Sequence, residues 1–304
     1  MMGRRSKRAS AQDALAGLRD GATLAIGGSL FHNKPMSLVR EIARRKLRGL
    51  TVVVMTQASI DVDLLIAAGC VGEVRVPYLG FEYLGLALNF RREAAAGRIR
   101  VWDCDETQVI AGMEAAAKNL PSGITKTGVG TDLLRTNPDL KEVADFITGE
   151  PMVAVPAIRP DYAIVHAARG DIYGNLAYAG YPFSDVLIAE ATHRAGGKLV
   201  ASVDEVVPNS HFGAEPFRTA IAHILVDFVV EAPWGAHPCS SHGSYQYDEA
   251  ALKAYQQCAR DGESAMAGWL REHVEAPASH EDYLDRALKP SALAALRREI
   301  YAGA

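Results

Sequence analysis

Residues 20–35 read Asp-Gly-Ala-Thr-Leu-Ala-Ile-Gly-Gly-Ser-Leu-Phe-His-Asn-Lys-Pro, and they decide the fold. The β-branched and aliphatic run 23–26 predicts a strand, Gly27 and Gly28 follow it at once, and Pro35 suits the first turn of a helix. Glycine allows a positive φ and a close approach by a ligand, and ligands of open α/β sheets sit beyond the carboxyl ends of strands. Exposed amides at such a bend can hold an anion or a developing oxyanion. The stretch therefore predicts either a ligand-binding bend or a tight turn without a ligand.

Strands and helices alternate through the first 230 residues. Apolar strands are predicted at 23–26, 51–55, 73–76, 99–102, 162–167, 199–203 and 225–230. Helices are predicted after a Ser10 cap and at 35–47, 62–68, 84–96, 107–118, 184–194 and 216–223. This alternation is typical of an α/β protein with an open, mostly parallel sheet flanked by helices.

Two remaining segments have other patterns. Residues 122–151, which contain Gly123, Gly128 and Gly130, predict a long irregular segment, and loops of that length are usually functional or disordered. Residues 248–304 predict a helical C-terminal extension, with helices at 249–259, 263–273, 281–288 and 293–301. No Ser/Gly/Pro-rich linker divides the chain, so we expect a flexible basic start over residues 1–10 and a single domain over 11–304.

The composition of the 304 residues narrows the functional class. With 49% hydrophobic and 22% charged residues the chain is typical of a globular protein, and a net charge of -4 gives no reason to expect nucleic acid. No apolar run reaches the ~18 residues of a membrane span, and no apolar segment of a secretory signal follows the basic N-terminal residues. The four cysteines are scattered without a C-x-x-C motif, which favours a reducing, cytoplasmic setting.

Several common motifs are absent from the sequence. No G-x-G-x-x-G follows a strand, no P-loop occurs, and Ser29 does not lie in G-x-S-x-G. His237, Cys239 and His242 lie close together in the sequence, but their spacing matches no common zinc pattern. We therefore expect no metal and no permanently bound cofactor.

An acidic cluster, residues 103–106, separates the predicted strand 99–102 from the predicted helix 107–118. A helix dipole favours negative charge at the helix N-terminus, so the cluster can be structural. A carboxylate beyond a strand end can equally act as a base or nucleophile if burial raises its pKa. The pattern alone leaves both explanations open for Glu106.

Two further glycine-bearing loops follow predicted strands. Residues 170–176 include Gly174 and Asn175, and residues 233–238 include Trp234, Gly235 and His237. A surface turn explains each loop. Because the carboxyl ends of parallel strands meet at one edge of a sheet, the loops can instead line a shared pocket.

Taken together, these residues resemble a known family. Residues 20–35, with an acid-Gly pair, an apolar strand, Gly-Gly and a later Pro, are similar to the first signature of the class I coenzyme A transferases in their α subunits. Ser29 stands where Phe is usual and Asn33 where Gly is usual. Further matches, spread in order over residues 12–256, are Gly130-Thr131-Asp132, residues 170–175 and residues 229–238, the last most like the α chains of the glutaconate CoA-transferase branch.

The resemblance implies a fold of the CoA-transferase type and an α subunit that works with a separate β subunit in an αβ or α2β2 enzyme. In such enzymes a β-subunit glutamate attacks an acyl-CoA and passes CoA, through a glutamyl-CoA thioester, to a carboxylic acid. Coenzyme A and acyl-CoA are thus the implied substrates. The implied pocket residues are Gly27, Gly28, Ser29, Asn33, Lys126, Gly130 and Thr131, with Gly174, Asn175, Trp234, Gly235 and His237 in supporting loops.

A second branch is similar as well, namely the α subunits of the two-subunit ring-cleaving CoA-thioester hydrolases of steroid degradation. In that branch a glutamate of the α subunit takes part, and Glu106 matches its position, while Lys126 stands where the branch has an arginine. Residues 33–36 also resemble this branch. Glu106 would then activate water, or a β-diketone carbon, for retro-Claisen C–C cleavage. We expect a transferase, with this hydrolase as the alternative; the third possibility is a non-catalytic binding or scaffold subunit.

Overall fold

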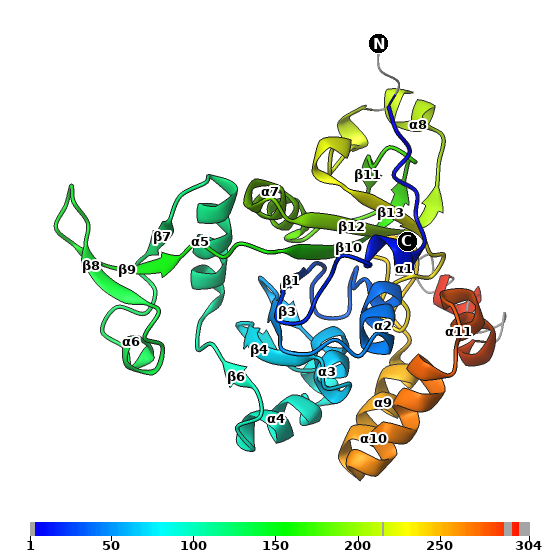
Figure 1. Cartoon of the computed structure of the whole chain (residues 1–304), viewed down its shortest axis with the longest axis horizontal. Helices are drawn as coiled ribbons and strands as arrows, with labels where there is room; N and C mark the ends of the chain where they lie inside the picture. Colours follow the sequence, from blue (N-terminus) through cyan, green and yellow to red (C-terminus); the bar gives the residue numbers. More distant parts are fainter. Residues whose placement is uncertain (1–3, 215, 289–293, 298–304) are drawn as a thin grey trace.

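An eight-stranded sheet runs through the middle of the molecule (Figure 1) in the computed structural model, which describes residues 4–214, 216–288 and 294–297. Its strands are β1 (Thr23–Ile26), β2 (Leu50–Val53), β4 (Val71–Arg75), β6 (Arg100–Val101), β10 (Tyr162–Gly170), β11 (Leu176–Ala177), β12 (Lys198–Val206) and β13 (Phe228–Glu231). The order β13-β12-β10-β1-β2-β4-β6 is parallel throughout, and β11 pairs antiparallel with β10. The open, mostly parallel sheet predicted from the sequence is confirmed.

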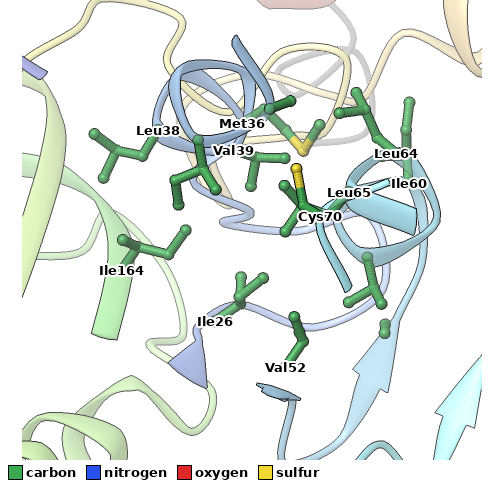
Figure 2. Packing of buried hydrophobic residues seen from close by; sticks show 14 of the residues in the cluster. Ile26, Met36, Leu38, Val39, Val52, Ile60, Leu64, Leu65, Cys70 and Ile164 are labelled. Carbon is green, nitrogen blue, oxygen red and sulfur yellow. The ribbon is translucent and has the colours of Figure 1, made fainter. Parts of the chain in front are cut away.

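Helices cover both faces of this sheet, because its strands are apolar on each side. On one face, Ile26 of β1 packs in the same apolar cluster as α2 (Met36–Arg44) and α3 (Ile60–Ala67), as Figure 2 shows. On the other face, Ala25 packs with α5 (Glu106–Ala117) and α7 (Asp185–Ala195). The end of β1 is thus fixed from two sides, which holds the bend that follows it. The other helices of the first half are α1 (Ala11–Ala14), capped by Ser10 as predicted, and α4 (Leu88–Ala95).

The C-terminal extension is helical and packs against the first half of the chain. It comprises α9 (Glu249–Asp261), α10 (Glu263–Leu270), a π-helical turn (Arg271–Glu275) and α11 (His280–Ala287) (Figure 1). The Tyr255 hydroxyl donates to the Asp63 carboxylate at 2.8 Å, and Arg44 donates to the Val274 carbonyl at 3.1 Å. The predicted extension is confirmed. Of the helix predicted over 293–301, residues 294–297 are helical and the rest lie outside the described residues.

A three-stranded antiparallel sheet, which we call the arm, extends beyond α5 away from the main sheet (Figure 1). It consists of β7 (Ser122–Thr125), β9 (Pro151–Pro156) and β8 (Lys141–Ala144), with the short helix α6 (Leu133–Thr136). The irregular segment predicted for 122–151 is therefore wrong. All four residues of β8 are exposed, and β7 alternates exposed and half-buried residues, so neither strand has the buried apolar run from which strands are predicted.

Two predicted helices differ in the structure. Residues 216–223 form no continuous helix; α8 (Asn209–Ala214) lies before them, and Ile221 pairs with Leu176 of β11 between two short 3-10 turns, Pro216–Arg218 and His223–Leu225. The helix predicted over 84–96 begins only at α4, because Gly85, at φ +125, closes a separate 3-10 turn, Glu82–Leu84. A two-stranded sheet of β3 (Gln57–Ala58) and β5 (Tyr78–Leu79) completes the fold.

The N-terminal segment also differs from the flexible start expected over residues 1–10. Val229 of β13 donates its N–H to the Lys7 carbonyl at 2.9 Å, and Ala9 donates to the Val229 carbonyl at 3.0 Å. This segment therefore lies along the edge of the main sheet. Within the described ranges, none of the helices combines the length and the apolar character needed to cross a bilayer.

Candidate functional site

Gly27 and Gly28 form a sharp bend directly after β1. Gly28 has φ +71, and a Cβ on it would lie 2.4 Å from the His32 carbonyl oxygen. A Cβ on Gly27 would lie 2.4 Å from the Asp185 Oδ1 atom. A side chain at either position would therefore clash with other atoms of this chain, whether or not a ligand is bound.

The backbone amides of the bend are already used within the chain, so the expectation that they hold an oxyanion is wrong for residues 27–30. Their partners come from distant elements, which local sequence patterns do not reveal. The hydrogen bonds are Gly27 to the Ile164 carbonyl (2.9 Å), Gly28 to the Asp185 carboxylate (2.7 Å), Ser29 to the His32 carbonyl (2.9 Å) and Leu30 to the Gln57 carbonyl (2.9 Å).

Asp185, the first residue of α7, holds the bend through hydrogen bonds. Its carboxylate accepts hydrogen bonds from the Gly28 amide at 2.7 Å and from the Tyr178 hydroxyl at 2.6 Å. Burial raises the pKa of Asp185 to about 6, although these two donors oppose the shift. Asp185 is thus a positioning residue for the bend.

Asn33 and Lys34 anchor the outgoing side of the bend. The Asn33 side chain accepts a hydrogen bond from the His242 amide at 2.8 Å and donates one to the Tyr181 carbonyl at 3.0 Å. Lys34 forms an ion pair with Asp61 of α3 at 2.9 Å, and both side chains are fully buried. Asn33 therefore replaces the usual glycine with a side chain that joins three loops.

A hollow of about 410 Å³ lies beside the bend. We call it the acyl hollow, after the acyl-CoA substrate that the resemblance implies. The Thr56 hydroxyl, on its wall, donates to the Ser29 hydroxyl at 3.1 Å. The lining is mostly apolar, and Glu190 is its one charged residue among those described. The lining residues are Met55, Thr56, Ile110, Tyr181, Phe183, Ser184, Val186, Leu187 and Glu190.

Glu106 begins α5 but does not cap it. Asp105 is the cap, since its carboxylate accepts the Gln108 amide at 3.1 Å and the Gln108 side chain accepts the Asp105 amide at 3.0 Å. The Glu106 side chain is exposed and has no hydrogen bond or ion pair with any described residue. Ile110, one turn further along the same helix face, lines the acyl hollow. The capping role thus belongs to Asp105, and Glu106 keeps only the favourable interaction of a first-turn carboxylate with the helix dipole.

Lys126, Gly130 and Thr131 lie in the loop of the arm between β7 and α6, close to the start of α5. The Gln108 side chain donates to the Thr127 carbonyl of this loop at 3.1 Å. The Lys126 ammonium pairs with Glu150 of the arm, and the Thr131 hydroxyl donates to the Gly128 carbonyl at 2.8 Å. None of these side chains contacts the glycine bend.

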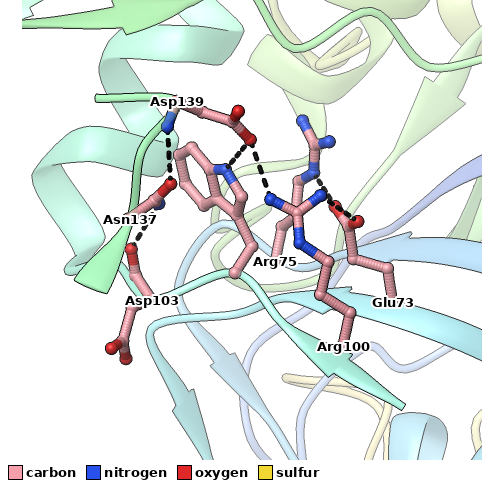
Figure 3. Close-up of polar contacts among 7 residues, drawn as sticks. Glu73, Arg75, Arg100, Asp103, Asn137 and Asp139 are labelled. Carbon is pink, nitrogen blue, oxygen red and sulfur yellow. Dashed lines mark hydrogen bonds and ion pairs between the residues drawn. The ribbon is translucent and has the colours of Figure 1, made fainter. Parts of the chain in front are cut away.

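Polar contacts fasten the start of α5 and the arm to the sheet edge (Figure 3). The Asn137 side chain donates to the Asp103 carbonyl at 2.7 Å. Asp139 accepts hydrogen bonds from the Trp102 indole at 2.9 Å and from Arg100 at 3.1 Å. Figure 3 shows the Asp103 carboxyl pointing away from this network. The position of Glu106 is therefore set by the sheet edge as well as by its own helix.

The supporting loops have structural contacts. Asn175 donates to the Asp171 carboxylate at 2.7 Å, and Gly174 donates its amide to the same group at 2.9 Å. Strand β10 pairs with the end of β1 at Ile164 and continues for six more residues to Gly170. The turn that contains Gly174 and Asn175 follows Gly170, so it lies further along the sheet than the glycine bend.

The loop of residues 233–238 docks the C-terminal extension. The buried His237 contacts the Tyr283 hydroxyl at 2.9 Å and the Asp248 carboxylate at 3.2 Å. Trp234 packs on Tyr245 with ring centroids 4.3 Å apart. The Gly235 carbonyl accepts the amide of Ser37 at 2.8 Å, near the start of α2. Among the described residues, no three His, Cys, Asp or Glu side chains gather in a group that could hold a metal ion.

Comparison with known proteins identifies the family to which a chain with this fold belongs. The family model for coenzyme A transferase matches residues 8–232. The chain belongs to the coenzyme A transferase family. The glutaconate coenzyme A-transferase of Acidaminococcus fermentans has a closely similar solved structure, with a TM-score of 0.89, 29% identity and 96% of each chain covered.

Two further proteins are similar to this chain in sequence, and one of them has a named function. The IpdA subunit of the cholesterol ring-cleaving hydrolase of Rhodococcus jostii is 37% identical over 273 residues, covering 86% of this chain and 89% of the relative. An uncharacterised protein of Archaeoglobus fulgidus is 33% identical over 297 residues, covering 96% of this chain but 64% of that longer protein. Both the transferase and the hydrolase branch noted in the sequence are therefore represented among the relatives.

In this member of the coenzyme A transferase family, the structure brings only part of the sequence-predicted site together. Ser29 lies at the acyl hollow, and Glu106 lies one helical turn from its Ile110 wall. Sequence reasoning missed Asp185, because nothing local distinguishes it from any other acidic residue in the first turn of a helix. Phe183 and the other apolar lining residues were missed for the same reason.

Proposed function

We propose that this chain is the α subunit of a two-subunit CoA-transferase, in which the acyl hollow holds the acyl group of an acyl-CoA. One observation carries the proposal: an apolar hollow lies beside a glycine bend whose amides are already used. Neither cysteine nor histidine lines that hollow among the described residues. We assign the nucleophile and the oxyanion donors to a partner chain, as the resemblance to the α subunits of the family implies.

The reaction on such a partner proceeds by ordinary acyl chemistry. A glutamate carboxylate on the β subunit would attack the thioester carbon and expel the CoA thiolate, which gives a mixed anhydride. The thiolate then attacks the glutamyl carbonyl and releases the product carboxylate, leaving a glutamyl-CoA thioester. The acceptor acid reverses these two steps and leaves as the new acyl-CoA.

Exposed apolar side chains on the arm support a partner chain. Phe146 is 91% exposed and Ile147 is 78% exposed at the turn between β8 and β9. Large apolar groups clustered on a surface are typical of a protein interface. The arm is tied to the start of α5, so a β subunit seated there would lie close to Glu106 and the acyl hollow. We infer an αβ or α2β2 assembly from this arrangement.

The chemistry of the hollow indicates an uncharged, apolar acyl group. Glu190 at its rim would repel a second carboxylate on the substrate, and no described Lys or Arg lines the hollow to pair with one. The αβ complex, assayed with acetate as acceptor, is expected to have a kcat/KM at least tenfold higher for cyclohexanecarbonyl-CoA or hexanoyl-CoA than for succinyl-CoA.

The matched variant Glu190→Gln is expected to lower the ratio of kcat/KM for the apolar acyl-CoAs to kcat/KM for succinyl-CoA. The reason is that glutamine does not repel the second carboxylate of the succinyl group. A preference for succinyl-CoA would contradict the substrate assignment. Failure to form acetyl-CoA from any donor would contradict the proposed transfer itself.

A second candidate, ring-cleaving hydrolysis of a CoA thioester, is favoured by Glu106. Its exposed carboxylate has no partner among the described residues and lies near the acyl hollow, as a general base for water requires. The likeness to the IpdA subunit supports the same candidate. The two functions differ in which chain supplies the essential carboxylate.

Replacing Glu106 by glutamine separates the two candidates. If Glu106 is a general base, Glu106→Gln lowers hydrolysis by the complex by about 100-fold or more, as loss of such a group does. If the partner supplies the nucleophile, CoA transfer stays within about threefold of the unmodified complex. Glu114→Gln is the control and is expected to change neither activity, because Glu114 lies on the same helix and pairs with Lys118 alone among the described residues. Absence of both activities in the unmodified complex would favour a scaffold role for this chain.

A further inference from the structure

A second hollow, of about 330 Å³, lies on the opposite face of the sheet from the acyl hollow. It is formed by α2, the start of α11, the N-terminal segment and the end of β13. Helix α2 covers the face to which Ile26 belongs, whereas α5 and α7 border the acyl hollow on the other face. The two hollows are therefore separate sites.

Arg40 of α2 lines this second hollow and carries a buried charge without an acidic partner. It is 2% exposed, and it donates to the His237 carbonyl at 2.8 Å and to the His280 Nδ1 atom at 3.2 Å. Its guanidinium carbon lies 3.6 Å from the centre of the Tyr283 ring. No carboxylate of the described residues forms an ion pair with it.

The His280 imidazole is held neutral and cannot balance that charge. Burial, followed by the Arg40 charge, lowers the pKa of His280 to about 3. Its Nε2 atom donates to the Pro233 carbonyl at 2.8 Å, so Nδ1 is the acceptor that faces Arg40. The Arg40 charge is therefore solvated by neutral groups only.

The other charges of the hollow have partners. Arg8 pairs with Glu231 at 2.5 Å, and Arg44 pairs with Glu41. The remaining carboxylate, Glu281, is exposed to water and accepts the Ser279 hydroxyl at 3.0 Å, without an ion pair to any described residue. Arg40 is thus the cation left over among the described lining residues. An unpaired buried charge is costly unless something of opposite charge joins it.

Ser37 supplies a second donor on the same helix face. It lies one turn before Arg40, is 6% exposed, and its buried hydroxyl has no hydrogen-bond partner among the described residues. The hydrogen bonds to His237 and His280 use only two of the five N–H donors of a guanidinium, so Arg40 keeps donors for a ligand. Guanidinium and hydroxyl groups are donors that carboxylate and phosphate oxygens prefer. We propose that this hollow is a binding site for a small oxyanion, a carboxylate or a phosphate group, held by Arg40 and Ser37.

Direct binding measurements test the site without relying on catalysis. The αβ complex is titrated calorimetrically in a chloride buffer, with acetate in one experiment and inorganic phosphate in a second. We expect saturable binding of at least one of these two anions. The anion that binds identifies which oxyanion the site takes. Ser37→Ala, which removes only the hydroxyl, is expected to weaken that binding about fivefold. Arg40→Lys keeps the charge but loses the fork, and is expected to weaken it at least tenfold.

Arg45→Met is the control, because Arg45 lies on the same helix and donates to carbonyls away from the hollow, at Leu15 and Leu18. Its oxyanion affinity is expected to equal that of the unmodified complex. Absence of binding of both acetate and phosphate would overturn the proposal. Binding that both Ser37→Ala and Arg40→Lys leave unchanged would also overturn it, because the anion would then occupy another place, such as the acyl hollow.

Discussion

Gly28→Ala is expected to destabilise the protein by roughly 2–5 kcal/mol and to lower the activity of the assembled complex about 100-fold. The positive φ of Gly28 costs a residue with a side chain about 1–2 kcal/mol, and forcing a methyl group into packed atoms costs about 1–3 kcal/mol more. The atom it would meet is the His32 carbonyl oxygen, which belongs to the backbone and cannot rotate away. The bend must shift, and shifts of about 1 Å in a substrate-positioning element cost about 100-fold in rate.

Gly21→Ala is the matched control for this prediction. Gly21 also has a positive φ, +75, but a Cβ there would meet nothing within 4 Å. The control is therefore expected to lose only about 1–2 kcal/mol and to keep its activity. Chemical denaturation of the isolated chain and kinetics of the complex measure the two effects. Equal losses for Gly21→Ala and Gly28→Ala would show that crowding at the bend does not matter.

Lys34→Met is expected to lower the free energy of unfolding by about 3–5 kcal/mol, because it leaves the Asp61 carboxylate buried without its counter-charge. Lys34 lies between the bend and α2, and Asp61 lies in the first turn of α3. The pair therefore ties the bend to a neighbouring helix. Urea titration followed by circular dichroism measures the change.

The double variant Lys34→Met with Asp61→Asn is expected to recover most of that loss. The asparagine removes the stranded charge and keeps an oxygen for the Ser59 amide, which Asp61 accepts at 2.7 Å. Lys253→Met is the surface control, since Lys253 and Glu249 form an exposed ion pair whose loss is expected to cost less than about 1 kcal/mol. If the double variant is no more stable than Lys34→Met alone, the penalty lies in packing rather than in charge.

Elements with a strong local signal were predictable from the sequence. Strand β1 matches its predicted range, because a β-branched threonine and three apolar residues lie directly before two glycines. Helix α5 begins one residue earlier than predicted, because Asp105 and Gln108 form a capping box. The arm was not predictable, because β7 pairs with β9 across a long stretch of chain, and because β7 and β8, unlike β9, contain no buried residue.

The candidate site was predictable only in outline. The glycines were recognised, but the groups that use their amides, such as the Asp185 carboxylate and the Ile164 carbonyl, lie more than 130 residues away. Whether Glu106 caps its helix depended on which of two neighbouring carboxylates faces the backbone, and the structure gives that role to Asp105. Such choices are made by tertiary packing, which spacing along one segment does not encode.

The contacts of Asn33 have a consequence for how the protein is made. Its side chain joins Tyr181 to His242, so the conformation at Asn33 depends on residues that are synthesised 148 and 209 positions later. A nascent chain on the ribosome cannot finish this region until His242 has left the exit tunnel. Products of premature termination before His242 therefore lack one of the two hydrogen bonds that hold the Asn33 side chain.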